Sequence, residues 1–407
     1  MGSGAGGKMR RRLEQAQVEL IYFDAGGGHR ASAVALATVL AAQFPGVRVA
    51  MVNLRERLDK LDYLRRCTGV KLENFYNALL RKGLAVGIGP MLRVLHLLVR
   101  EMHPRMVRML AEGWARHRPD LVVSLIPHFN RSLFEGLEAA ARIRREAAPP
   151  LVTVMTDLAD YPPHFWIEPQ EQFLVCGTGT AARQALALGF PAHLILRSSG
   201  MIVRPEFYRV PFDSRAAERA KLGLEQDRPT GVVMFGGCGS RRMELIAEAV
   251  ADGNREVQLI FACGRNDGLA QRLAARRLPY PHFVVGFTEA MPYFMRLADF
   301  FIGKPGPGSI SEALVCGLPV IVERNRLTMP HERFNTDWLR QHQLGLVVSS
   351  FTTIDRAIAH LLEGKRLDHY RRRIAAHHNQ AVFEIPRMLE AILEAGAPSA
   401  PRASLSA

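Results

Sequence analysis

The N-terminal half of the chain alternates short apolar runs with longer amphipathic stretches. The runs are rich in Val, Ile and Leu, and they predict β-strands at residues 18–23, 48–52, 121–125, 151–156, 172–175 and 193–198. Apolar positions three and four residues apart predict helices at 31–44, 106–117 and 181–188. A strand, a glycine-rich turn, a helix and a second strand in this order open a doubly wound α/β domain.

The C-terminal half repeats this layout. Strands are predicted at 230–235, 257–263, 282–285, 300–302 and 319–323, helices at 241–251, 290–297 and 310–316, and helical structure through 353–395. The predicted fold class is therefore α/β, with two doubly wound, Rossmann-like domains that face each other across a cleft. Ligands of such domains bind beyond the carboxyl ends of the strands, where the glycine-rich turns lie.

The same pattern sets the expected domain boundaries. We expect a flexible leader at 1–17, an N-terminal domain at 18–203 and a C-terminal domain at 204–375. A helix at 376–395 is expected to cross back to the first domain, and 396–407 to form a disordered tail.

The segment 58–110 interrupts the alternation, because it is helical in pattern and unusually apolar. Its last part has a basic stripe at helical spacing, formed by Arg93, His96 and Arg100, with Leu92, Leu95 and Leu98 on the rest of the surface. A basic amphipathic helix of this kind can lie in a membrane interface. The alternative is a core helix with a solvated stripe.

The composition is ordinary except for its charge. The 407 residues are 48% hydrophobic, and 53 Lys and Arg stand against 39 Asp and Glu, a formal net charge of +14. No uncharged apolar run reaches about 18 residues, so a membrane-spanning helix is not expected. The excess indicates an anionic partner, namely phosphorylated molecules, a membrane surface or nucleic acid, or else dispersed, solvated Arg. No nucleic-acid recognition motif accompanies it, so nucleic acid is disfavoured.

The cysteines and the N-terminus indicate the compartment. The five cysteines lack CxxC spacing, which is typical of a reducing environment and disfavours a structural zinc site. No apolar stretch follows the basic residues near the N-terminus, so no signal peptide is expected and the chain should stay in the cytoplasm.

The most specific local chemistry lies in Gly303–Ala313, between a predicted strand and a predicted helix. Gly306 and Gly308 let a ligand approach the backbone, and the helix start offers free N–H groups and a positive dipole end to a phosphate. Ser309 adds a hydroxyl, and Glu312 can accept hydrogen bonds from a ribose. The alternative is structural, with Ser309 as the helix cap and Glu312 in the capping-box position.

Two features of the N-terminal half reach the same cleft. The turn Asp24–Arg30 places three glycines, Gly26, Gly27 and Gly28, at a helix start and delivers His29 into the cleft. His29 can take a proton from a hydroxyl acceptor, or only hydrogen-bond to the backbone beside an anion site. Asp157, after the strand at 151–156, adds a carboxylate at the same edge.

The C-terminal half contributes two further groups. Gly236 and Gly237 form a third glycine turn, and Glu332 and Asn335 offer polar groups to a hydroxylated ligand. Each feature is weak alone, but their convergence on one cleft predicts a site for a phosphorylated, hydroxylated small molecule.

Together these segments resemble a family of glycosyltransferases, the one that includes plant monogalactosyldiacylglycerol synthase and bacterial processive diacylglycerol glucosyltransferases. The similar pieces are FDAGGGHRASA (23–33), VTVMTDL (152–158), GMIVRPEF (200–207), GFTEAMPYFMRLADFFI (286–302), KPGPGSISEAL (304–314) and PHERFN (330–335). More distantly, the chain is similar to the enzyme that adds N-acetylglucosamine in lipid II synthesis. The resemblance runs from about Val18 to Val348.

The resemblance implies a GT-B fold and an inverting transfer of a hexosyl group from a UDP-sugar to a lipid hydroxyl, with no metal and no cofactor. The UDP-sugar site that it implies consists of Gly236, Gly237, Gly286, Phe287, Gly306, Gly308, Ser309, Ile310, Glu312, Glu332 and Asn335. Uracil would lie at Gly286 and Phe287, and ribose at Glu312. His29 would be the leading general base, with Asp157 as its competitor or partner.

The resemblance also implies a lipid acceptor and an anionic membrane surface as partners. It therefore favours the membrane-facing interpretation of Leu92, Arg93, Leu95, Leu98 and Arg100, with Arg65, Arg66 and Arg81 beside them. The expected location is the cytoplasm, peripheral on the inner face of the cell membrane. The sugar-binding motif GQE of the family reads Pro330–Glu332 here, so the donor sugar stays open.

Other functions compete with this one. The acceptor could be a polyprenyl-diphosphate intermediate, or the chain could bind a nucleotide sugar without turnover. A GT-B epimerase acting on UDP-N-acetylglucosamine is disfavoured by the DAGGGHR turn at 24–30.

Overall fold

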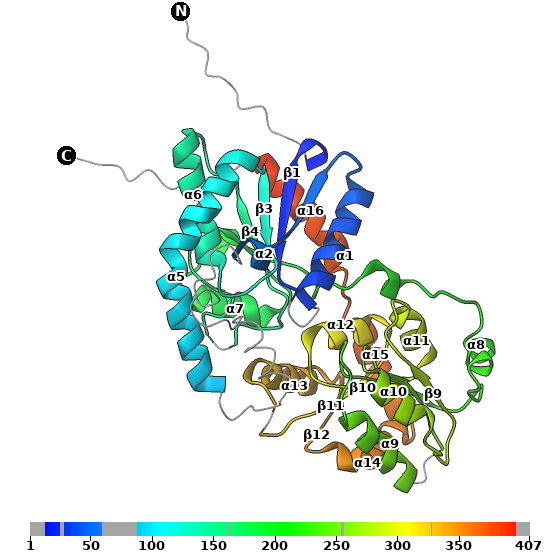
Figure 1. Cartoon of the computed structure of the whole chain (residues 1–407). Coiled ribbons are helices and arrows are strands. Elements are labelled where there is room, and N and C mark those ends of the chain that lie inside the picture. Colours follow the sequence, from blue (N-terminus) through cyan, green and yellow to red (C-terminus); the bar gives the residue numbers. More distant parts are fainter. Residues whose placement is uncertain are drawn as a thin grey trace, which may run out of the picture.

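Two α/β domains make up the protein, each built on a six-stranded parallel sheet (Figure 1). The structure, a computed structural model, describes residues 13–24, 28–58, 88–161, 163–253, 256–326 and 328–395. Within these ranges the side chains of residues 58, 88–100 and 331 are not described. The predicted fold class is confirmed.

The N-terminal sheet has the strand order β2-β1-β3-β4-β5-β6. Its strands are β1 (Gln17–Tyr22), β2 (Arg48–Asn53), β3 (Leu121–Ser124), β4 (Leu151–Val154), β5 (Phe173–Cys176) and β6 (Ile195–Arg197). Its helices are α1 (Gly28–Gln43), α2 (Leu54–Leu58), α5 (Ile88–His117), α6 (Asn130–Arg144) and α7 (Gly179–Ala187), with 3₁₀ turns at Leu13–Gln15 and Ala192–Leu194. The strand order reverses between β1 and β3, which makes their carboxyl ends the switch point where ligands bind in such sheets.

The C-terminal sheet has the order β12-β11-β10-β7-β8-β9, with its switch point between β7 and β10. The strands are β7 (Thr230–Met234), β8 (Gln258–Ala262), β9 (His282–Val285), β10 (Phe300–Gly303), β11 (Val320–Glu323) and β12 (Gly345–Val348). The helices are α8 (Arg215–Lys221), α9 (Arg242–Asp252), α10 (Asp267–Ala274), α11 (Met291–Leu297), α12 (Pro307–Val315), α13 (Pro330–His342), α14 (Ile354–Leu362) and α15 (Arg366–Ala376). Two 3₁₀ turns lie at Pro205–Tyr208 and Phe351–Thr353.

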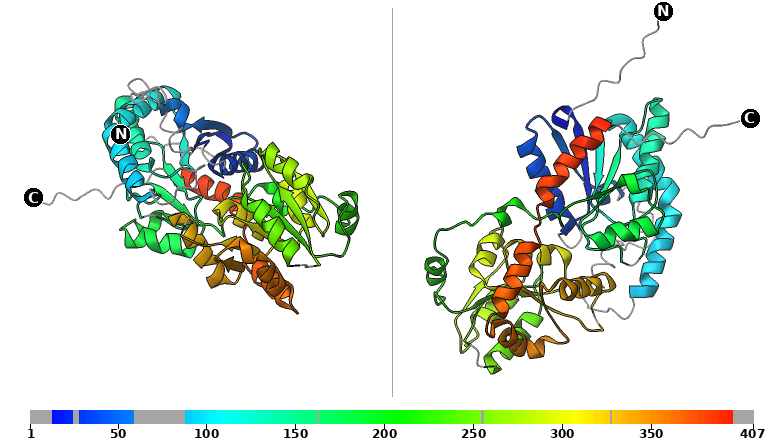
Figure 2. Two further views of the ribbon diagram at one scale, coloured as in Figure 1. Left: turned by 60° about the horizontal axis from the view of Figure 1, so that its bottom comes forward. Right: turned by 180° about the vertical axis from the view of Figure 1, so that it is seen from behind.

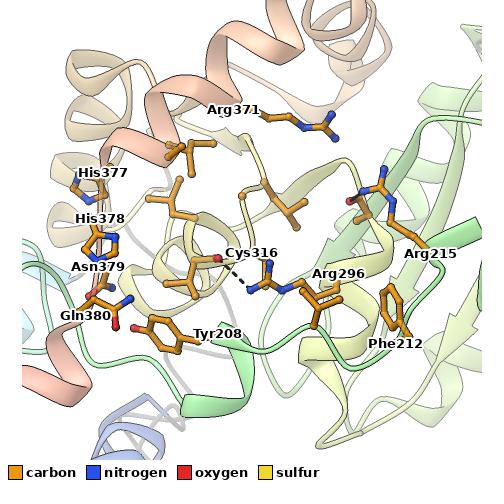
Figure 3. A pocket seen from close by; sticks show the side chains of 18 of the residues that line it. Tyr208, Phe212, Arg215, Arg296, Cys316, Arg371, His377, His378, Asn379 and Gln380 are labelled. Atoms are coloured by element: carbon orange, nitrogen blue, oxygen red, sulfur yellow. Dashed lines mark hydrogen bonds between the residues drawn. The ribbon is translucent and has the colours of Figure 1, made fainter.

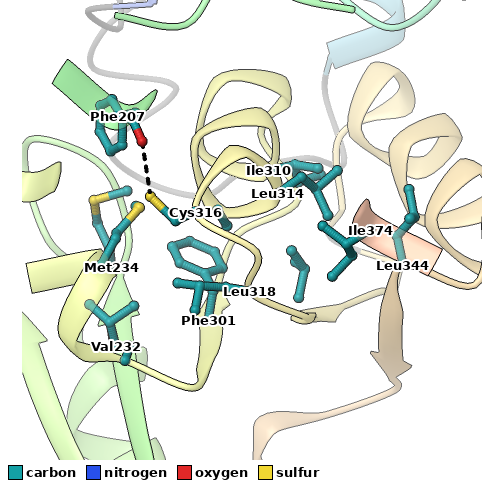
Figure 4. Packing of buried hydrophobic residues seen from close by; sticks show 14 of the residues in the cluster. Phe207, Val232, Met234, Phe301, Ile310, Leu314, Cys316, Leu318, Leu344 and Ile374 are labelled. Carbon is teal, nitrogen blue, oxygen red and sulfur yellow. Dashed lines mark hydrogen bonds between the residues drawn. The ribbon is translucent and has the colours of Figure 1, made fainter. Parts of the chain in front are cut away.

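Both faces of each sheet are covered, which explains the continuous apolar runs of the strands. In β7, Val232 and Met234 pack toward α11 and α12, whereas Val233 packs toward α9 and α14 on the other face. Figure 4 shows the first of these layers, in which Phe207 from the linker joins the core of the C-terminal domain. Because Phe207 is fully buried there, the linker is part of that domain's core.

Several helices differ from the prediction. The helix expected at 106–117 is the last part of α5, which continues back to Ile88 and contains Pro104. The region expected to be helical at 353–395 consists of α14, α15 and a separate helix α16 (Ala381–Ala395). Left-handed Gly364 separates the first two, since its φ of 58° cannot continue a helix. The helices α6, α8, α10 and α13 and the strand β12 were not predicted.

The chain crosses between the domains twice, and the two crossings lie side by side. Asn379 donates to the Met201 carbonyl oxygen at 3.0 Å, and the Gln380 N–H donates to Ser199 Oγ at 2.7 Å. After the second crossing, α16 packs against α1 in the core of the N-terminal domain (Figure 2). Gly200 is required here, because a Cβ at this position would lie 2.5 Å from the Asn379 side chain.

Candidate functional site

The site lies where the switch points of the two sheets meet. In the chain, α1 is the next described element after β1, the turn at 235–241 follows β7, and the turn before α12 follows β10. A stacked pair, Tyr161 from the loop after β4 and Phe334 from α13, joins the two sides with ring centroids 5.9 Å apart. Residues beyond the carboxyl ends of the two sheets are therefore in contact, as the predicted arrangement of the domains requires.

His29 lies in the first turn of α1 and is held by the end of β4. Its Nδ1 is 3.0 Å from Thr156 Oγ1, and its ring centroid is 5.9 Å from that of Trp166. Burial lowers the pKa of His29 from 6.5, while the Asp157 carboxylate and the Leu125 carbonyl oppose this shift. The imidazole is therefore neutral at pH 7 and able to accept a proton.

Asp157 is oriented by a different group. Its Oδ2 accepts a hydrogen bond from the Trp166 indole N–H at 2.8 Å, and Trp166 is fully buried. The loop that carries Trp166 is fixed by the buried Asp160, which accepts the backbone N–H groups of Trp166 at 2.6 Å and His164 at 2.8 Å. Thr156 thus orients the His29 ring, whereas Asp157 acts on it through charge. Neither Thr156 nor Trp166 was predicted as a site residue.

The end of β3 adds a strained residue that was also missed. His128 has a left-handed backbone with φ of 67°, and its ring lies 4.1 Å from that of Phe165. A non-glycine residue in this conformation costs free energy and is concentrated at functional sites. Asn130 braces the turn by donating to the Trp166 carbonyl oxygen at 3.2 Å. The short apolar strand before His128 was predicted, but its backbone angle cannot be seen in the sequence.

In the C-terminal domain, α12 begins three residues earlier than the capping alternative required. Gly306 is the N-cap residue, Pro307 is the first helical residue, and no side chain caps the helix. Ser309 is therefore inside the first turn, and the structural alternative of a Ser309 cap is wrong. Since the first N–H groups of a helix have no intrahelical acceptor, Gly308 and Ser309 present theirs at a positive dipole end.

Two cations that were not predicted as site residues accompany this helix end. The Lys304 ammonium lies 3.6 Å from Glu332 Oε1, and the stem of Lys304 passes Gly306, where a Cβ would lie 3.4 Å from Lys304 Cε. Arg242 at the start of α9 pairs with Glu323. Burial lowers the pKa of Arg242, and the Glu332 carboxylate opposes this shift. Glu332 therefore lies between two cations beside the helix end, at the place predicted for the sugar.

Glu312 lies one turn further into α12 with an unusual protonation equilibrium. Burial raises its pKa to about 7, against the opposing charge of Arg204. Arg204 comes from the linker, stacks 5.1 Å from the Phe207 ring centroid and donates to the Glu289 carbonyl oxygen. The linker thus contributes a cation to the site, which the sequence analysis did not single out.

The remaining predicted residues have distinct environments. Phe287 is 54% exposed with the Arg265 guanidinium 4.2 Å above its ring, and a Cβ at Gly286 beside it would lie 3.8 Å from the Gly264 carbonyl oxygen. An exposed ring backed by a cation is a suitable platform for a flat base. Gly236 has φ of 73°, a conformation that favours glycine, and a Cβ at Gly237 would meet nothing within 4 Å.

Two predicted residues, Asn335 and Ile310, pack behind the turn before α12 and the first turn of this helix. Asn335 is 2% exposed and donates to the Pro305 carbonyl oxygen at 2.8 Å, so it fixes the turn before α12. Ile310 is fully buried in the hydrophobic core. The structure therefore places these side chains behind the turn, whereas the resemblance implied a direct place in the ligand site.

Some predicted residues cannot be placed. Gly26 and Gly27 lie outside the described residues, and Gly28 is the first residue of α1. Arg65, Arg66 and Arg81 also lie outside them, as do the side chains of Leu92, Arg93, Leu95, Leu98 and Arg100. None of the described helices has the length and apolar character needed to span a bilayer. The described residues contain no group of three or more His, Cys, Asp and Glu that could hold a metal ion.

Comparison with known proteins agrees with this geometry. Residues 232–367 match the glycosyltransferase family 28 C-terminal domain. Monogalactosyldiacylglycerol synthase 1 of Arabidopsis thaliana is 27% identical over 357 residues, which are 84% of this chain and 64% of that protein. The chain is similar to the monogalactosyldiacylglycerol synthases. A probable synthase of Glycine max is 27% identical over 372 residues, 88% of this chain and 66% of that protein.

The resemblance found in the sequence is thus confirmed, although the chain spans less than two thirds of the length of these relatives. Solved structures confirm the GT-B fold. MurG of Acinetobacter baumannii has a TM-score of 0.57 at 14% identity and covers 93% of this chain and 100% of its own. The glycosyltransferase SnogD of Streptomyces nogalater has a TM-score of 0.56 at 17% identity, with 93% and 99% covered.

Proposed function

We propose that the protein transfers a hexosyl group from a UDP-sugar to the hydroxyl of a diacylglycerol-type lipid, with inversion at the anomeric carbon. One observation carries the proposal: a neutral histidine lies beyond the carboxyl ends of one sheet, and an uncapped helix end that can bind an anion lies beyond those of the other. The similarity to monogalactosyldiacylglycerol synthases supports the lipid acceptor, because these relatives are named for a galactosylated diacylglycerol.

His29 acts as the general base in this proposal. Its lowered pKa keeps it neutral, and Thr156 holds its ring in one orientation. The imidazole takes the proton of the acceptor hydroxyl while the hydroxyl oxygen attacks the anomeric carbon on the face opposite UDP. The nearby Asp157 carboxylate stabilises the imidazolium that forms, and Trp166 keeps this carboxylate in place.

The C-terminal domain stabilises the departing UDP. The bond between the anomeric carbon and the β-phosphate oxygen breaks, and the new charge on that oxygen is met by the start of α12 and by Lys304. Helix dipole and ammonium together take the role that a divalent metal has in other transferases, so we propose a reaction without metal or cofactor. Glu312 binds the ribose, Phe287 supports the uracil, and Glu332 contacts the sugar.

The acceptor places the reaction at a membrane. A diacylglycerol-type lipid stays in the bilayer, so we propose that the protein works as a peripheral enzyme on the cytoplasmic face of the cell membrane. The net charge of +14 supports this location through attraction to anionic lipid.

The test offers purified full-length protein four donors, UDP-glucose, UDP-galactose, UDP-glucuronate and UDP-N-acetylglucosamine. Each donor is combined with vesicles that contain either diacylglycerol or a polyprenyl diphosphate acceptor, and the lipids are analysed by mass spectrometry. We expect a hexosyl diacylglycerol with one donor and a β-linkage by NMR. A product formed only on the polyprenyl diphosphate would overturn the acceptor class, and UDP-sugar binding without any product would overturn the enzyme itself.

A further inference from the structure

A second cavity lies away from the cleft, beside both crossings between the domains. Its volume is about 620 Å³, and Figure 3 shows the residues around it. One wall comes from the linker after Phe207, and another from the end of α15 and the second crossing at 377–380. The mechanism proposed above uses none of its lining residues.

Three arginines next to this cavity share one carboxylate. Arg215 and Arg371 both donate to Asp299 Oδ1, at 2.7 and 2.8 Å, and Arg219 donates to Asp299 Oδ2 at 2.7 Å. Arg215 and Arg371 line the cavity, and their side chains are 40% and 35% exposed. Arg215 also donates to the Ala298 carbonyl oxygen at 3.1 Å. Arg219 is buried, and its other N–H groups donate to the carbonyl groups of residues 226, 228 and 297.

This cluster carries more positive than negative charge. Three guanidinium groups against one carboxylate leave an excess of two positive charges. Burial lowers the pKa of Arg219, the Asp299 carboxylate opposes this shift, and the charges of Arg215 and Arg371 lower the pKa further. Asp213 contributes one exposed carboxylate at the cavity, and Arg296 contributes one more cation. The cavity therefore stays cationic, and a doubly charged anion would balance it.

The rest of the lining suits an organic group. Phe212, Leu314 and Leu318 add apolar side chains to the lining of the cavity. Arg296 donates to two carbonyl oxygens, those of Phe207 and Val315. The Tyr208 hydroxyl is buried at the cavity and has no hydrogen-bond partner among the described residues. A buried unpaired hydroxyl is costly, so it is a donor available to a ligand.

We propose that this cavity binds a phosphate monoester, with the phosphate on Arg215 and Arg371 and the organic group on the apolar wall. A phosphate dianion matches the two excess charges, and its oxygens suit paired guanidinium donors. The ligand would touch the segment 208–213, which follows the first crossing, and residues 377–380 of the second crossing. The site is thereby suited to sense or set their relative position, and it does not depend on the reaction proposed for the cleft.

Phenyl phosphate is the probe, because it combines a dianion with a small apolar group. Arginines of the folded wild-type protein are modified with phenylglyoxal at increasing phenyl phosphate concentration, and mass spectrometry measures each arginine separately. We expect protection of Arg215 and Arg371 but not of Arg372, which is exposed on the same helix and does not line the cavity. Unchanged modification of Arg215 and Arg371 would overturn the proposal. Because each residue is followed separately, binding of the probe in the cleft does not confuse the result.

A pair of variants makes the test quantitative. Arg371→Gln should raise the phenyl phosphate concentration that half-protects Arg215 by at least about tenfold, since a charge-assisted contact is lost. Arg372→Gln makes the same change of charge on the same helix and should leave that midpoint unchanged. If both variants raised this midpoint equally, the effect would come from the overall charge of the protein, and the proposed binding site would be overturned. If Arg371→Gln does not fold, the protection of Arg215 and Arg371 in the wild-type protein still tests whether the cavity binds phenyl phosphate. Inorganic phosphate that binds as tightly as phenyl phosphate would overturn the role of the apolar wall.

Discussion

Replacing Glu312 by glutamine tests whether a carboxylate at this position binds the donor. Burial raises the pKa of Glu312 to about 7, so the group changes its charge within the range where the protein works. Only the ionised form accepts two hydrogen bonds from a ribose diol without giving a proton. Donor binding should therefore weaken as the pH falls through 7.

The magnitude follows from the titration. Between pH 8 and pH 6 the ionised fraction of a group with a pKa of about 7 falls about tenfold, which corresponds to about 1.4 kcal/mol. The dissociation constant of the donor should rise by about this factor. Glu312→Gln should bind more weakly at pH 8 by about 1–3 kcal/mol, the usual cost of a lost charge-assisted hydrogen bond. Its dissociation constant should vary less with pH than that of the wild type.

The free energy of unfolding should depend on pH in the opposite direction from donor binding. The folded-state pKa of about 7 lies above the ordinary value of 4.5, so the folded state holds the proton more tightly than the unfolded state does. The free energy of unfolding of the wild type therefore falls as the pH rises from 4.5 to about 7, by at most about 3 kcal/mol. Glu312→Gln lacks this loss and should be more stable than the wild type at pH 8 but not at pH 4.

The assay is isothermal titration of a UDP-sugar at pH 6, 7 and 8, with urea unfolding at pH 4 and 8. A UDP-sugar is preferable to UDP, because its diphosphate does not titrate in this range. Asp337→Asn is a matched control, since Asp337 is half-exposed on α13. Identical pH dependence of donor binding in the wild type and Glu312→Gln would refute the assignment of Glu312 to the ribose.

Three further results are expected. His29→Ala should abolish transfer while UDP still binds, and the acid limb of wild-type kcat/KM should lie below pH 6.5, because burial lowers the His29 pKa; turnover within a few-fold of wild type would exclude His29 as the base. Trp166→Phe removes the hydrogen bond to Asp157 and should lower the free energy of unfolding by about 1.5–3 kcal/mol. The same variant should reduce kcat more than it changes KM, and an unchanged kcat would contradict the role of Asp157. Lys304→Met should weaken UDP binding about tenfold or more and reduce its salt dependence, whereas Lys221→Met on the exposed α8 should change neither.

The sequence indicated the architecture because each strand is short, apolar and followed by its turn. Strand, glycine turn and helix are local patterns, so the glycine turns at 24–30 and 303–308 and the residues His29 and Glu312 could be found from neighbours alone, whereas Phe287 came only from the resemblance to a family. The helices α6 and α13 were missed although their apolar positions are regular, since their first turns are polar and begin at Asn130 and Pro330.

Only the tertiary structure decided how the side chains of the site work together. Thr156, and not the neighbouring Asp157, orients His29, while the indole that holds Asp157 comes from a loop that the strand pattern does not describe. The raised pKa of Glu312 depends on its burial in the folded protein, and the cation that opposes this rise, Arg204, reaches it from the linker. Hydrogen bonds and burial of this kind depend on distances between residues that are remote in sequence.

For the charge of the chain, too, the sequence determined one part and the tertiary structure another. Composition established an excess of cations and narrowed the partners to anions, because net charge is a sum over residues. Folding decided where part of that excess lies: Arg215, Arg219 and Arg371 come from two helices more than a hundred residues apart, and they meet at Asp299 only because α8 and α15 pack beside the start of β10. A local pattern can place a glycine turn, but three arginines on one carboxylate require the packed structure.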